Sequence, residues 1–224
     1  FYFSLPYLLS YFLQTLYGMA DLFIIGQFEG AAGTTAVSIG SQVMHMITVI
    51  IVGLAMGTTV SIAQAVGAKD KKQASRCTGN TITLFLGVSI LLLLVKPIVL
   101  VMSTPSEAVS GTVAYLTICF IGIPFIIAYN IISSIFRGLG DSKSPMYFIA
   151  VACAANIALD YLFMGALHLG PSGAALGTTL SQTLSVILAL IAIRKRDTGI
   201  RLTRSDLSPQ TAVMGQILKI GVPI

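Results

Sequence analysis

Apolar runs of about 20 residues recur along the whole chain, and they restrict its fold more than any other feature. A run of this length, wound as an α-helix, crosses the roughly 30 Å hydrocarbon core of a bilayer. Six such runs lie at about 3–27, 35–65, 77–101, 108–136, 146–166 and 173–193. The sequence therefore predicts an all-α, polytopic membrane protein, with a six-helix transmembrane bundle followed by the start of a seventh helix.

The composition agrees with a chain that resides in a bilayer. Hydrophobic residues make up 55% of the chain and charged residues 9%, whereas a soluble domain usually carries about 25% charged residues. The mean hydropathy is +0.91. The chain has 13 Lys and Arg against 8 Asp and Glu. This excess does not indicate a nucleic-acid partner, because the positions of the basic residues follow membrane topology instead.

The basic residues gather on one side of the predicted bundle. The connections near 66–76 and 137–145 and the segment after 193 hold eleven of the 13, namely Lys69, Lys71, Lys72, Arg76, Arg137, Lys143, Arg194, Lys195, Arg196, Arg201 and Arg204. The alternate connections, near 28–34, 102–107 and 167–172, hold none. Since Lys and Arg concentrate in cytoplasmic loops, we expect these basic segments and the N-terminus on the cytoplasmic side of the cell inner (plasma) membrane.

The chain divides into three predicted parts. Residues 1–193 form an amino-terminal six-helix lobe, 194–211 a basic cytoplasmic linker, and 212–224 the start of helix seven and of a second lobe. Residues 220–224 (IGVPI) resemble residues 4–7 (SLPY) in placing a proline near the start of an apolar helix, a weak sign of a second repeat. Because the chain starts without Met, we expect it to be part of a longer protein.

Polar residues inside the spans converge on one depth. Asp21 lies in the first span, and Asn156 and Asp160 lie one helical turn apart in the fifth. Tyr115 in the fourth span and Thr178 in the sixth fall at about the same level. A carboxylate inside a bilayer costs at least ~2.5 kcal/mol, so two acids at one depth predict a proton or cation site.

These residues leave two ions and one non-transporting alternative open. An acid can bind a proton alone, with Tyr115 donating its hydroxyl to it. A sodium ion would need several oxygens, and we expect them from Asp21, Asn156, Asp160 and Thr178. The alternative is a structural hydrogen-bond knot between helices. No His/Cys cluster has the spacing of a metal site, and no nucleophile–base pair is visible, so we expect neither a cofactor nor an enzyme.

Four motifs carry a family resemblance. Pro6 is followed by residues 21–26 (DLFIIG), then by 137–145 (RGLGDSKSP), 156–162 (NIALDYL) and 173–178 (GAALGT). In this order they resemble the multidrug and toxic compound extrusion (MATE) transporters over the whole chain. The resemblance implies a twelve-helix, two-lobe transporter of which this chain is the amino-terminal half, dependent on a missing carboxy-terminal lobe. It implies export of amphipathic, often cationic, compounds in exchange for H⁺ or Na⁺.

The resemblance also assigns roles to residues. In one bacterial branch, related to a DNA-damage-inducible member, the coupling site lies in this lobe, and its residues match Asp21, Tyr115, Asn156, Asp160 and Thr178, with Pro6 as the bending point of helix one. Another branch has Asn where Asp160 stands, so Asp160 favours the first branch.

Two rival functions are weighed against export. A flippase for lipid-linked precursors, from the same superfamily, should line its cavity with several Arg or Lys to bind a pyrophosphate. The spans hold almost none, since Lys96 is near a helix end. A non-transporting structural subunit would have little use for two acids at one depth.

Overall fold

The computed structural model describes residues 4–94, 105–195, 206 and 208–221, with the side chains of 88–94 left out. Every regular element in these ranges is a helix. They are α1 (Ser4–Phe28), α2 (Ala31–Gly67), α3 (Lys71–Leu94), α5 (Val109–Gly138), α6 (Lys143–Asp160), the π-helix η1 (Tyr161–Ala166), α7 (Gly170–Lys195) and α8 (Thr211–Gly221). The all-α prediction is confirmed.

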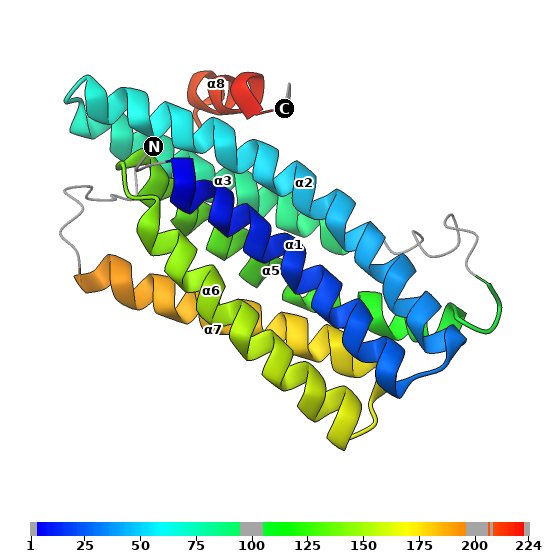
Figure 1. The fold of residues 1–224 in the computed structure, drawn as a ribbon. Helices are drawn as coiled ribbons and strands as arrows, with labels where there is room; N and C mark the ends of the chain where they lie inside the picture. The colour runs from blue at the N-terminus through cyan, green and yellow to red at the C-terminus, as the bar shows by residue number, and fades with distance from the viewer. Residues whose placement is uncertain (1–3, 95–104, 196–205, 207, 222–224) are drawn as a thin grey trace.

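The long helices form one bundle in which successive helices run in opposite directions. The N-terminus, the α2–α3 turn and the end of α7 lie at one end, which also holds Lys69, Arg137 and Lys143 and is called the basic end below (Figure 1). The α1–α2 and α6–α7 connections lie at the opposite end. Within the bundle α5 packs between α2 and α7, while α6 packs between α1 and α7.

Five helical stretches in the described ranges are long and apolar enough to cross a membrane. They are Ser4–Phe28, Ala31–Gly67, Val109–Gly138, Lys143–Ala166 and Gly170–Lys195. They match the first, second, fourth, fifth and sixth predicted spans, with ends that differ by a few residues. The third predicted span, 77–101, lies partly outside the described residues, and α3 covers its first part. The helix expected from 212 begins at Thr211.

The RGLGDSKSP motif forms a tight turn at the basic end. Gly140 has a φ of +86°, a conformation that glycine adopts without steric cost. Asp141 then caps α6, because its Oδ1 accepts hydrogen bonds from the backbone N–H groups of Lys143 and Ser144, both at 3.1 Å. The turn thereby fixes where α6 starts, and α6 carries Asn156 and Asp160.

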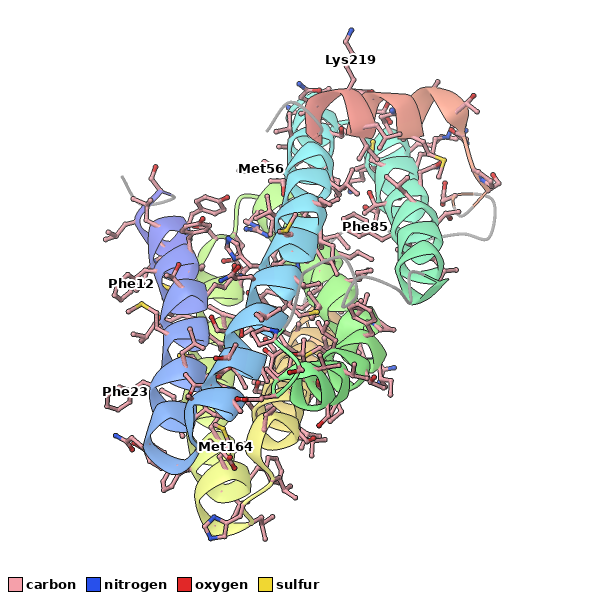
Figure 2. All side chains as sticks on the ribbon, turned by 90° about the vertical axis from the view of Figure 1, so that its right-hand side faces the viewer. Phe12, Phe23, Met56, Phe85, Met164 and Lys219 are labelled. Atoms are coloured by element: carbon pink, nitrogen blue, oxygen red, sulfur yellow. The ribbon has the colours of Figure 1, made fainter. Side chains whose placement is uncertain are left out.

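The outer face of the bundle is apolar. Phe12 and Phe23 of α1 are 61% and 65% exposed, and Figure 2 shows both pointing away from the other helices. Without a hydrophobic driving force between them, membrane helices pack through small residues. Gly122 of α5 accordingly lies against Thr179 of α7, and Gly40 of α2 against the ring of Tyr115.

Candidate functional site

Two carboxyl groups and one amide are buried where α1, α6 and α7 meet. Asp21 of α1 is 2% exposed, and Asn156 and Asp160 of α6 are both 0% exposed. Asn156 and Asp160 share one face of α6, as their spacing of four residues predicts. Thr178 of α7 donates a hydrogen bond from its hydroxyl to Asp21 Oδ2 at 3.0 Å. The structure therefore brings these four predicted site residues together.

The site is short of hydrogen-bond partners. Asp160 and Asn156 lie close enough to Asp21 to interact with its carboxylate. Nevertheless, the site holds five of the ten buried side-chain atoms that lack a hydrogen-bond partner in the described structure, namely Asp21 Oδ1, Asn156 Oδ1, Asn156 Nδ2, Asp160 Oδ1 and Asp160 Oδ2. Buried polar groups in proteins are almost always paired, so this concentration of unpaired atoms makes the site a candidate for binding a further ligand.

The chemistry of that ligand follows from the atoms. Two ionised carboxylates in a low-dielectric interior repel each other strongly, and each unpaired polar group adds a desolvation cost. A proton or a cation would reduce the repulsion and give the unpaired oxygens a partner. Four of the five atoms are oxygens, which suits either H⁺ or Na⁺. The described residues contain no group of three His, Cys, Asp or Glu side chains placed to hold a metal ion.

Asp160 occupies an unusual position in its helix. It is the last α-helical residue before η1, in which the N–H of Leu167 bonds the carbonyl of Leu162, five residues earlier. The fifth predicted span is thus not a continuous α-helix. Single π-helical turns occur frequently at functional sites. Sequence periodicity did not reveal this one, because a π turn keeps the same apolar residue types.

Gly177 of α7 makes room for the acid, and sequence reasoning did not single it out for this role. A Cβ atom on Gly177 would collide with Asp160 Oδ1 and would lie 3.2 Å from Asp160 Cγ. It would also lie 3.6 Å from Asn156 Nδ2. The carboxyl group therefore rests directly on the backbone of α7. The only sequence signal was the adjacency of Gly177 to Thr178.

Tyr17 and Ser181 extend the site by one helical turn, and sequence reasoning missed both. The Tyr17 hydroxyl donates to the Thr178 carbonyl oxygen at 3.0 Å and also contacts the Ser181 hydroxyl. Tyr17 precedes Asp21 by four residues, and Ser181 follows Thr178 by three. Residues three or four apart lie on the same face of a helix, so this spacing could have identified both.

Tyr115 is buried near Asp21, but its expected hydrogen bond to an acid is not present. It is 2% exposed, and its hydroxyl pairs with Ser41 Oγ of α2 at 3.2 Å. That prediction is corrected, because the bare backbone of Gly40 lets the ring lie against α2 and brings the hydroxyl to Ser41. Tyr115 thus borders the site and ties α5 to α2.

Pro6 lies at the basic end of α1, and the helix continues through it to Phe28. Its carbonyl oxygen accepts a bond from the Ser10 hydroxyl at 2.8 Å. Serine hydroxyls that bond back to the preceding turn often bend helices. The guanidinium of Arg137 lies 5.4 Å from the centre of the Tyr7 ring beside Pro6. The bending role of Pro6 stays a prediction.

Comparison with known proteins identifies the chain's relatives. The profile of the MatE family matches residues 6–162. The probable multidrug resistance protein YpnP of Bacillus subtilis is 32% identical over 99% of this chain and 50% of its own length. The probable multidrug resistance protein NorM of Thermotoga maritima is 29% identical over 98% of this chain and 49% of its own length. The chain thus spans about half the length of the curated relatives it matches.

Solved structures agree with the sequence relatives. An inward-facing conformation of a multidrug resistance MATE family transporter of the MOP superfamily matches with a TM-score of 0.88 and 30% identity, over 94% of this chain and 49% of the other. An outward-facing conformation of such a transporter also gives a TM-score of 0.88 and 30% identity, over 99% of this chain and 50% of the other. The architecture is therefore that of one half of a two-lobe transporter.

Proposed function

This chain belongs to the MatE family, and on that basis we propose that the complete protein is a secondary antiporter that exports amphipathic, cationic compounds in exchange for protons. The chain contributes the amino-terminal lobe and the coupling site, and a second lobe completes the substrate path. The protein is a carrier and catalyses no covalent chemistry. This proposal follows the bacterial branch that is related to the DNA-damage-inducible member.

One observation carries the proposal, namely the buried acid pair with unpartnered oxygens. Asp21 and Asp160 come from different helices, and together with Asn156 they leave five atoms unpaired. A purely structural knot between helices would pair these atoms with each other. A site that takes up and releases a proton must instead be incomplete in one of its states.

The contacts of α1 supply a link between charge and conformation. Asp21 and Tyr17 both lie on α1, and both bond groups of α7 around Thr178. When a proton neutralises Asp21, the charge-assisted bond from Thr178 weakens. The contacts of α1 with α7 then differ between the loaded and the empty site, as a ligand-driven change of conformation requires. We propose that Pro6 lets the basic end of α1 follow this change.

The orientation is part of the same proposal. The basic end would face the cytoplasm, with the N-terminus inside and the protein spanning the cell inner membrane several times. A cysteine in place of Lys71 and one in place of Ser106, each in a background without the native cysteines, should label from opposite sides. Equal labelling of both by an impermeant reagent in intact cells would refute this topology.

The function is tested with the complete protein in proteoliposomes. Asp160→Asn should reduce proton-driven transport of a cationic dye at least tenfold at normal protein levels, because Asn cannot exchange a proton. Asp21→Asn should behave alike. The matched control is Asp70→Asn at the exposed start of α3, where Asn caps a helix as well as Asp does. Full transport by either site variant would remove that acid from the coupling site.

The choice of ion has its own test. Asn156→Ala removes a coordinating oxygen and should abolish transport driven by sodium. With proton coupling it should chiefly move the pH optimum. Robust dye movement under a sodium gradient without a pH gradient, unaffected by a protonophore, would establish Na⁺ in place of H⁺. The oxygens of Asp21, Asn156, Asp160 and Thr178 would then be its ligands.

The flippase alternative receives no support from the described structure. Among the described Lys and Arg residues of the bundle, Arg137 alone stacks on a ring, that of Tyr7 at the basic end, and none is fully buried, whereas a pyrophosphate would need several such side chains.

A further inference from the structure

A second buried polar cluster lies away from the acid site, where residues 206 and 208–221, called segment 206–221 below, meet α3. Asn80 of α3 is 0% exposed. Its side-chain amide bonds the backbone of two residues that precede α8, Asp206 and Gln210. Its Nδ2 donates to the carbonyl oxygen of Asp206 at 3.3 Å and to that of Arg76 at 3.0 Å. Its Oδ1 accepts from the backbone N–H of Gln210 at 2.6 Å. The side chain thus acts as a clamp on the chain that leads into α8.

Glycines bring the same segment unusually close to α2. A Cβ atom on Gly53 would lie 2.9 Å from the carbonyl oxygen of Gly221. One on Gly57 would collide with the carbonyl oxygen of Ile217. Conversely, a Cβ on Gly221 would lie 2.6 Å from the carbonyl oxygen of Gly53. Such reciprocal backbone contact is typical of tightly associated helices.

Apolar packing completes the contact. Val213 and Ile217 of α8 lie in one hydrophobic cluster with Ile62 of α2, Cys77 of α3 and Ile135 of α5. Figure 2 shows α8 packed on α2 and α3, with Lys219 pointing away from both helices. One face of α8 is therefore buried on the lobe and the other is free.

We propose that the surface formed by Gly53, Gly57, Gly79 and Asn80 is a permanent docking surface for the chain's own segment 206–221. By this proposal α8 moves with the amino-terminal lobe throughout the transport cycle. The boundary between the lobes then lies beyond Gly221, whereas the sequence alone places it at 212. A backbone approach is needed at Gly79 too, because a Cβ there would collide with the Asp206 carbonyl.

The docking itself stands on these contacts, whereas its constancy during transport rests on the proposed function. A cross-link separates the two. Gln216 Nε2 donates to Gln64 Oε1 at 3.4 Å, and both side chains are exposed. The variant carries Gln64→Cys and Gln216→Cys in the complete protein, with Cys77, Cys119 and Cys153, which are free and buried, replaced by alanine.

A short, reducible bis-methanethiosulfonate, which spans a gap the length of the two glutamine side chains, should cross-link this pair nearly completely, as read by mass spectrometry. Dye transport should remain within about twofold of the reduced form. The matched control pairs Gln64→Cys with Lys219→Cys, which faces away and should cross-link at least tenfold more slowly. Absence of the cross-link would refute the docking. A cross-link that stops transport until it is reduced would refute the constancy and make the contact a gate.

Failure of the proposed function is distinguishable from failure of the docking. If the reduced pair does not transport, the antiport proposal fails, whereas a high yield of cross-link still supports the docking. If the reduced pair transports but no cross-link forms, the docking fails and the antiport proposal stands.

Asn80 is tested by the accessibility of the buried face of α8. Val213 is 7% exposed, so the cysteine of a Val213→Cys variant should react slowly with a soluble maleimide. Adding Asn80→Ala should speed labelling by about tenfold, because three hydrogen bonds are lost. The control is Asn130→Ala, since Asn130 is also buried but bonds only the Ile126 carbonyl of its own helix. Unchanged labelling with Asn80→Ala would refute its role as the clamp.

Discussion

Two asparagines are completely buried in this lobe, and they are satisfied to opposite degrees. Asn80 makes three hydrogen bonds, two of them to the segment that enters α8. Asn156 makes none in the described structure. Burial alone therefore does not separate a structural polar residue from a functional one. The state of their hydrogen bonds separates these two residues, because a structural knot gains nothing from unpaired atoms.

The strongest way to break this comparison is to make the same substitution at both positions. Asn156→Leu should abolish coupled transport while the melting temperature of the purified protein is unchanged or higher, since no paired group is orphaned. Asn80→Leu leaves the Gln210 N–H and the Asp206 carbonyl without this partner. The free energy of unfolding should fall by about 2–3 kcal/mol, with transport per folded molecule retained. Equal loss of stability in both variants would contradict the distinction.

A second test alters the backbone beneath the acid. Gly177→Ala should lower dye transport at least tenfold, because the new methyl group displaces Asp160 from α7. Gly18→Ala on α1 is the matched control, since nothing lies within 4 Å of a Cβ at that position. Transport assays at matched expression compare the two. Normal activity of Gly177→Ala would show that the close approach is not required.

A third test alters the backbone beneath α8. Gly57→Ala should lower the free energy of unfolding by about 1–3 kcal/mol, because overpacking forces the α2 and α8 backbones apart. Gly67→Ala, at the end of the same helix, meets nothing within 4 Å and should change stability by less than about 1 kcal/mol. Thermal melting in detergent measures both. A stable Gly57→Ala variant would mean that α8 can separate from α2 at little cost.

The smallest effect is expected at the edge of the acid site. Ser181→Ala removes one contact of Tyr17, but the Tyr17 hydroxyl keeps its bond to the Thr178 carbonyl. The apparent affinity for the driving cation should change by less than about fivefold, or about 1 kcal/mol. Ser134→Ala is the control, as its hydroxyl bonds only its own helix at Asn130. A larger change at Ser181 would place it inside the coupling site.

Much of the fold could be predicted because the length of each apolar run and the charge of each connection can be read without knowing how the helices pack. Apolar runs located five described spans and left a connection near 137–145, where the turn before α6 lies. The convergence of Asp21, Asn156, Asp160 and Thr178 could be predicted too, since membrane thickness converts residue count into depth. Depth says nothing about rotation around each helix, which explains why the partner of Tyr115 was predicted wrongly.

Other features depend on contacts between segments that sequence spacing does not encode. Asn80 and Gln210 are 130 residues apart in the chain, and no periodic pattern relates them. The role of Gly177 emerges only when α6 and α7 lie side by side. Glycines in membrane helices predict close packing in general, but the identity of the neighbour comes from the fold.

The π-helix after Asp160 also affects how this chain is compared with its relatives. A π turn contains about one residue more than an α turn of the same height. Aligning this segment with a relative whose helix is continuously α-helical therefore requires a one-residue gap somewhere in Tyr161–Ala166. Without that gap, the alignment would be shifted by one residue on one side of the π-helix. Asp160 or Gly173 would then be matched with the wrong residue of the relative. An acid inherited by descent would then be counted as lost.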